Sequence, residues 1–114
     1  METIEHIFIA CPQGQNVWAR LGINPGTSEW RFPWLIGANL ALPPSVQLDV
    51  VLLTLWHIWK ARNTAIFDHH TMTGTEVLHR IISDMDSWSC RYKKLIADWT
   101  AWRNYYNNCR ANVP

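Results

Sequence analysis

The stretch that decides the fold is Leu55-Trp56-His57-Ile58-Trp59-Lys60-Ala61-Arg62-Asn63, which continues to Phe67. Residues 46–59 are mostly apolar. Large side chains recur within the stretch at steps of three and four, which places on one helical face Trp56, Trp59, Asn63 and Phe67. Two indoles within one helical turn are the largest apolar mass that a small core could use. We therefore expect this face to pack inward.

Two long helices are expected around a turn at residues 69–72. Pro43-Pro44 cannot lie inside a helix, so the first helix is expected at about residues 45–68. Thr73-Gly74-Thr75-Glu76 fits a capping box, in which the Thr73 hydroxyl reaches the Glu76 amide and the Glu76 carboxylate reaches back. Apolar residues then recur in near-heptad steps with no Pro or Gly, which predicts one helix over about residues 74–107. Joined by a short turn, the two helices form an antiparallel hairpin.

Two short helices and an aromatic-rich loop are expected before the hairpin. Residues 2–10 and 15–21 each place apolar side chains on one side, and Pro and Gly separate the two segments. The connector, residues 23–44, contains alternating aromatic residues at Trp30, Phe32 and Trp34. Alternation can indicate a strand, but we prefer a loop whose rings plug the helical core. The predicted fold is all-α, a single helical domain over residues 1–114.

Composition narrows the class of protein. A chain of 114 residues that is 48% hydrophobic forms one domain with a thin core. A charged content of 17% and a net charge of +1 argue against a strongly basic nucleic-acid binder. An odd cysteine count at wide spacing indicates reduced thiols, at Cys11, Cys90 and Cys109. The acidic start and the short apolar runs predict no secretory signal and no membrane span, hence an intracellular protein of the nucleus or cytoplasm.

The end of the long second helix is a candidate partner site. Because the second helix is predicted to be longer than the first, its last turns overshoot the hairpin and carry Trp99, Trp102, Tyr105 and Tyr106. Either the segment before residue 45 covers these rings, or they form an exposed apolar patch of the kind that marks partner sites. The second case predicts self-association or binding of a helical protein through Trp99, Trp102 and Tyr106.

Few residues suggest chemistry. His6 and Cys11 have the spacing of the second half of a zinc site, but two ligands do not complete a structural site, so we expect this half-site to be empty. The acidic residues are scattered, and no nucleophile arrangement or phosphate loop is visible, so we expect no enzyme and no cofactor. Basic residues alternate with aromatic ones at residues 88–99, a pattern that can bind single-stranded nucleic acid, although the rings fit a packing seam better.

Two motifs together resemble a known family. Glu2-Thr3-Ile4-Glu5-His6-Ile7-Phe8-x-x-Cys11-Pro12, followed by Val17-Trp18, looks like the end of the zinc-binding domain that follows the reverse transcriptase of plant LINE-type (non-LTR) retrotransposons. Trp56-x-x-Trp59-Lys60-x-Arg62-Asn63-x-x-x-Phe67 resembles the segment that comes next in such polyproteins. In the family, a Cys-x2-Cys pair precedes the His and Cys and completes the zinc site.

The resemblance implies a role without catalysis. Residues 1–22 would be the remnant of the zinc-binding domain, residues 23–44 a connector and residues 45–114 the helical linker. Zinc would then belong to the intact family domain, and nucleic acid would be engaged only within a parent polyprotein. The expected function is a non-catalytic remnant of a reverse transcriptase polyprotein, and the alternative is a stand-alone helical interaction module.

Overall fold

The computed structural model describes residues 12–23, 40 and 42–111, and within these residues the chain is all-α with no strand. The four α-helices are α1 (Pro12–Leu21), α2 (Gln47–Phe67), α3 (Gly74–Trp88) and α4 (Ile96–Ala111). Two short 3-10 turns, η4 (Pro44–Val46) and η5 (Ser89–Arg91), precede α2 and follow α3. The predicted helix over residues 2–10 and most of the aromatic-rich loop lie outside the described residues.

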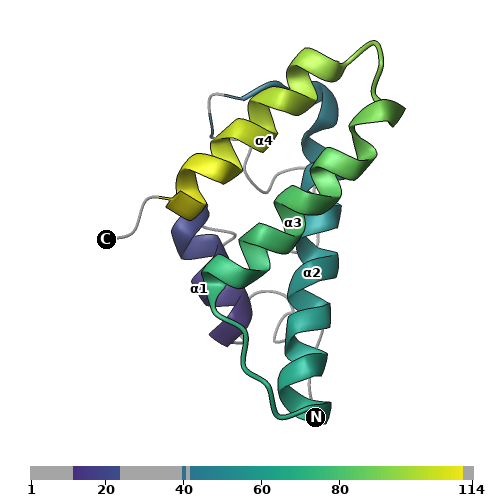
Figure 1. The fold of residues 1–114 in the computed structure, drawn as a ribbon. Helices are drawn as coiled ribbons and strands as arrows, with labels where there is room; N and C mark the ends of the chain where they lie inside the picture. The colour runs from purple at the N-terminus through teal and green to yellow at the C-terminus, as the bar shows by residue number, and fades with distance from the viewer. Residues whose placement is uncertain (1–11, 24–39, 41, 112–114) are drawn as a thin grey trace.

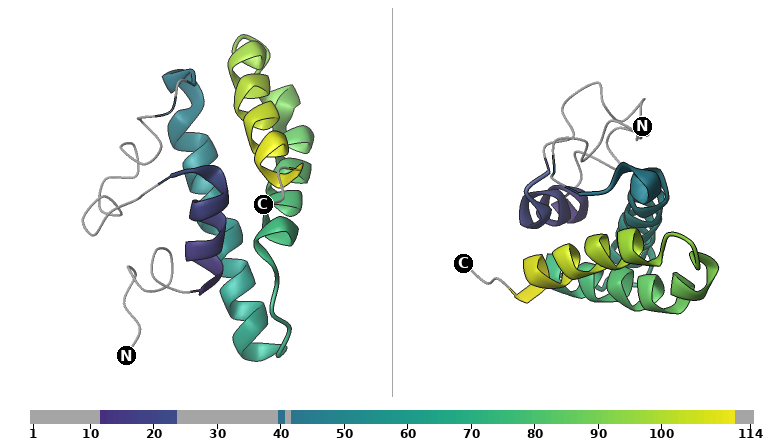
Figure 2. Two further views of the ribbon diagram at one scale, coloured as in Figure 1. Left: turned by 90° about the vertical axis from the view of Figure 1, so that its left-hand side faces the viewer. Right: turned by 90° about the horizontal axis from the view of Figure 1, so that it is seen from above.

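The helices form a small bundle in which each long helix runs back along its predecessor. α3 returns beside α2, and α4 returns along α3 in the opposite direction (Figure 1). α1 lies beside α2 and also contacts α3 and α4 (Figure 2). None of the helices in the described ranges is long and apolar enough to cross a bilayer.

The start of α3 confirms the predicted capping box in its main contact. Thr73 has an extended backbone, and its Oγ1 accepts a hydrogen bond from the Glu76 amide at 3.1 Å. The Glu76 carboxylate reaches back to the Thr73 hydroxyl at 3.4 Å, rather than to the Thr73 amide. One of the free amides of the first helical turn is thereby satisfied.

Replacing Thr73 by alanine is expected to lower the free energy of unfolding by about 1 kcal/mol, the usual effect of losing such a cap. Urea unfolding followed by circular dichroism measures this loss. Thr71→Ala is the matched control, because Thr71 is exposed and lies in the turn before the cap. Equal losses in the two variants would contradict the role of the cap.

The prediction of one helix over residues 74–107 is wrong. The helix ends at Trp88, and residues 89–95 form η5 and a turn before α4 begins at Ile96. Ser89 contributes locally, because its hydroxyl donates to the Asp86 carbonyl at 2.8 Å and so competes with continued helical bonding. The fold-back returns the aromatic residues of the second half onto α3, where an unbroken helix would have carried them past the end of α2.

Burial explains why the chain turns back. Trp99, Trp102 and Tyr106 are each at most 1% exposed. Full burial of a large apolar side chain stabilises a fold by roughly 1.5–3 kcal/mol. A backbone hydrogen bond contributes about 0.5–1.5 kcal/mol, and the turn keeps two of these, from Tyr92 to Ser89 and from Leu95 to Tyr92. Burying three rings therefore outweighs the loss of helix at the break.

The face of α2 that was expected to pack inward is the outer one. Trp56 is 50% exposed, Trp59 37% and Phe67 73%, so this prediction is wrong. The buried face repeats at the steps of an amphipathic helix and consists of Gln47, Val50, Val51, Leu53, Thr54, His57, Ile58 and Ala61. Thr54 and His57 make this face look less apolar in sequence than the face that carries the indoles.

Two of the polar residues on the inner face, Thr54 and His57, have partners on neighbouring helices. Thr54 Oγ1 donates to the Val50 carbonyl at 2.8 Å and lies 2.7 Å from the Tyr106 hydroxyl. His57 Nε2 lies 2.6 Å from the Asp84 carboxylate on α3. A buried polar group destabilises a fold only when it lacks a partner, so these contacts allow the polar face to lie inside.

Candidate functional site

The residues predicted to bind a partner lie in the core. Trp99, Trp102 and Tyr106 are covered by α3 and by the segment before residue 45, so the first alternative is the one observed and no exposed aromatic end exists on α4. An exposed patch was expected only if the second helix was unbroken and extended past the first. The turn at residues 89–95 breaks that helix, so the rings do not extend past the bundle. These three rings are therefore not exposed to a partner in the folded chain.

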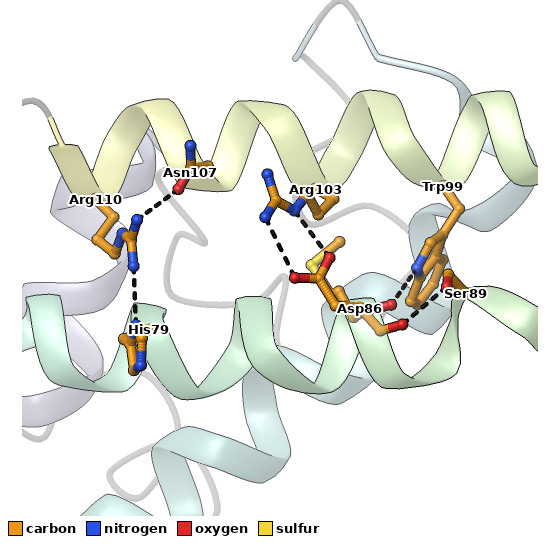
Figure 3. Close-up of polar contacts among 8 residues, drawn as sticks. His79, Asp86, Ser89, Trp99, Arg103, Asn107 and Arg110 are labelled. Carbon is orange, nitrogen blue, oxygen red and sulfur yellow. Dashed lines mark hydrogen bonds and ion pairs between the residues drawn. The ribbon is translucent and has the colours of Figure 1, made fainter.

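Three aromatic residues of α4 also donate a hydrogen bond to a backbone carbonyl. Trp99 Nε1 donates to the Met85 carbonyl at 2.7 Å, within the last turn of α3 (Figure 3). Trp102 Nε1 donates to the Pro43 carbonyl at 2.7 Å, and the Tyr105 hydroxyl donates to the Leu21 carbonyl at 2.5 Å. Carbonyls in the last helical turn lack intrahelical donors, so Trp99 and Tyr105 satisfy groups at the ends of α3 and α1.

The predicted metal half-site is not described. His6 and Cys11 lie outside the described residues, and within residues 12–23, 40 and 42–111 no three His, Cys, Asp or Glu side chains come together as ligands for a metal ion. His79 is engaged with Arg110, whose Nη1 lies 2.8 Å from its Nδ1 (Figure 3).

A stripe of large apolar side chains runs along the outer face of α2. We call it the α2 stripe, and its members recur at steps of four, four and three: Leu48, Leu52, Trp56 and Trp59. All four are exposed, and the Trp56 and Trp59 rings stack with centroids 5.2 Å apart. Exposed apolar patches of this kind mark surfaces that bind a partner. The α2 stripe is therefore the candidate functional surface.

A cleft lies beside the α2 stripe, between α2 and the end of α3. Its volume is about 450 Å³, within the range of roughly 300–1,000 Å³ typical of ligand pockets. The residues that line it are Asp49, Leu52, Leu53, Trp56, Trp88 and Tyr92. Trp88 and Tyr92 are half-buried and belong to the segment where the chain turns back. The break after α3 therefore builds one wall of the cleft.

Cations border the cleft on both walls. Lys60 Nζ lies over the Trp56 ring, 5.8 Å from its centroid, and the Arg91 guanidinium lies over the Trp88 ring at 5.4 Å. Both side chains are exposed. These cations lie where they could meet an acidic group on a bound molecule.

Within the cleft, Asp49 and Tyr92 form a hydrogen bond with each other. The Tyr92 hydroxyl donates to the Asp49 carboxylate at 2.8 Å. Burial and this bond to an anion both disfavour the phenolate, and they raise the pKa of Tyr92 to about 12. The phenol therefore stays a neutral donor at neutral pH. The Tyr92 ring stacks on Trp99 at 4.1 Å, which anchors this wall to the core.

The apolar residues of this surface are visible in the sequence, but their spacing was expected to mark the core face of the helix. A helix that is apolar on more than one side has more apolar surface than one small core can cover. Residues 46–59 are of this kind, because an inner face and the α2 stripe both fall within them. The contribution of Trp88 and Tyr92 could not be seen without the turn at residues 89–95.

The two motifs that carry the resemblance differ in what the structure describes of them. The first lies almost wholly before Pro12 and outside the described residues, whereas the second forms the middle and end of α2. Comparisons of this chain with models of known protein families, with curated proteins and with solved structures found no match.

Proposed function

We propose that this chain is a non-catalytic part of a plant LINE-type retrotransposon polyprotein, the end of the zinc-binding domain together with the linker that follows it. In this proposal the helical part acts as a binding segment. One observation carries it: Trp56, Trp59 and Phe67, the aromatic residues of the second motif, lie on the outside of α2. The intervening residues His57, Ile58 and Ala61 build the core instead.

The outward position of these rings supports binding because the fold does not need them. A small soluble domain gains nothing from large exposed apolar side chains, whereas a segment that packs against a neighbour does. These rings come after Val17 and Trp18, which are buried in α1 and belong to the first motif. This order agrees with a segment that follows a zinc-binding domain.

The genomic DNA on both sides of the coding sequence tests the origin. We expect an in-frame Cys-x2-Cys just upstream, preceded by reverse transcriptase codons. Flanking DNA without any reverse transcriptase sequence on either side would overturn the proposal. For zinc, native mass spectrometry of the metal-loaded chain is expected to show no retained ion, and an ion that requires both His6 and Cys11 would contradict the expectation of an empty half-site.

A stand-alone interaction module is the second candidate, and the α2 stripe with its cleft favours it. This candidate differs from the original alternative in its surface, because Trp99, Trp102 and Tyr106 are buried. The same flanking DNA separates the two candidates: a complete gene of its own, with no element sequence around it, supports the module.

A further inference from the structure

The α2 stripe has the length and shape of a surface that takes one helix. From Leu48 to Trp59 it covers twelve residues, and the eleven steps between the two ends span about 16 Å at 1.5 Å per residue. Its members follow the steps by which one helix packs along another. A partner helix of about three turns would therefore cover the stripe, with its largest apolar side chain in the cleft beside Trp56 and Trp88.

The charges around the cleft indicate an acidic partner. Lys60 borders the α2 wall and Arg91 borders the opposite wall, so cations lie on both sides of the apolar floor. Two further exposed cations, Lys93 and Lys94, follow Tyr92 directly. Asp49 is acidic and lines the cleft, but its carboxylate already accepts a hydrogen bond from Tyr92. A partner with acidic residues beside its apolar anchor would complement this arrangement.

A second copy of the chain fits this surface less well. In a two-fold dimer the same patch meets itself. Such a contact would bring two sets of Lys60 and Arg91 onto one interface, with only the engaged Asp49 to offset them among the residues that line the cleft. Like charges brought together across an interface disfavour the complex.

Single-stranded nucleic acid also fits less well. Base stacking needs a free aromatic face, and the rings here are engaged: Trp56 stacks on Trp59, and Tyr92 stacks on Trp99. Lys60 and Arg91 lie over the Trp56 and Trp88 rings. The net charge of the chain is only +1, which gives little general attraction to phosphate.

We infer that the α2 stripe and its cleft bind an acidic amphipathic helix, whose apolar anchor enters between Trp56 and Trp88 and whose carboxylates meet Lys60 and Arg91. This inference rests on the proposed function as a binding segment and specifies the partner of that surface.

A displayed library of 14-residue amphipathic helices tests it on the full chain. Anchor positions vary among large apolar residues, and flanking positions vary among glutamate, lysine, glutamine and serine. We expect selection to enrich glutamate over lysine at the flanks. Binding of the selected peptides, measured by fluorescence anisotropy, should weaken about ten-fold or more in Trp56→Ala, as for a buried anchor. Circular dichroism of each variant confirms that it is folded.

Charge exchange provides the matched control. The double variant Lys60→Glu/Arg91→Glu should weaken binding of the glutamate peptide about ten-fold and bind a lysine version of that peptide instead. Arg110→Glu changes charge at the far end of α4, and Ile66→Ala removes an exposed apolar side chain about 15 Å along α2 from Trp56. Both should leave binding within about two-fold, the behaviour of residues outside the contact.

Several outcomes would overturn the inference. Selection of neutral or basic flanks, no enrichment over a Trp56→Ala bait, or binding of an oligo-deoxythymidine strand in place of any peptide would each do so. A dimer in sedimentation that is lost in Trp56→Glu would assign the stripe to a second copy. These results are independent of the flanking DNA, so failure of the partner assignment and failure of the polyprotein origin can be told apart.

Discussion

Replacing Trp102 by alanine is expected to lower the free energy of unfolding by about 3–5 kcal/mol, the range for removing a large aromatic residue from a core. The Trp102 side chain is fully buried in α4, and its Nε1 donates to the Pro43 carbonyl. Its loss leaves a cavity and removes the donor to that carbonyl. Since small domains are stable by only about 5–15 kcal/mol, the variant should lose a large share of its stability.

Trp56→Ala is the matched control, because it makes the same change on the exposed α2 stripe. Half of the Trp56 side chain is exposed, and its ring stacks on the ring of Trp59, which is also exposed. We expect a loss of about 1 kcal/mol or less, as for most surface substitutions. Urea unfolding of both variants checks the order. A larger loss for Trp56→Ala than for Trp102→Ala would mean that the faces of α2 are assigned the wrong way round.

Removing the partner of His57 is expected to have the second largest effect. Asp84→Ala leaves the buried Nε2 of His57 without its acceptor, and an unsatisfied buried donor costs about 1–3 kcal/mol. Asp86→Ala is the control two residues along the same helix. Asp86 pairs with Arg103 on the surface at 2.9 Å (Figure 3), and such exposed pairs contribute at most about 1 kcal/mol. Equal losses would contradict a special role for Asp84.

Because His57 is buried beside Asp84, the free energy of unfolding is expected to depend on pH. Burial lowers the pKa of His57 below its usual value of 6.5, despite the opposing effect of Asp84, while Lys60 and Arg80 lower it further. The unfolded chain therefore binds more protons than the native chain as pH falls below about 6.5. The free energy of unfolding should be fully retained above that pH and should decrease below it. NMR titration of the His57 ring together with unfolding at pH 5 and pH 7.5 checks this, and a raised His57 pKa would contradict it.

Local signals in the sequence identified α2 and the start of α3. The Thr73–Glu76 capping box and the two prolines before residue 45 act within a few residues, so their effect can be read from spacing alone. The near-heptad apolar pattern expected over residues 74–107 also predicted burial correctly at Val77, Ile81, Met85, Trp99, Trp102 and Tyr106. This pattern could not show the turn at residues 89–95, because an unbroken helix and a folded-back pair of helices would both bury it.

The position of the candidate surface depends on which apolar face of α2 is buried, and residue spacing does not determine this. α2 has two apolar faces, and burying either one would satisfy a helical period. The structure buries the face with the smaller side chains, including Val50, Thr54 and Ala61, and leaves the indoles of Trp56 and Trp59 outside.

The sequence by itself determined an all-α chain, the limits of α2 and the start of α3, because these depend on caps, prolines and periodicity within a few residues. Only the tertiary structure decided which face of α2 is core and where the last helix turns back. Both depend on the space left between α1, α3 and α4, where small side chains allow close packing and polar ones find partners such as Asp84.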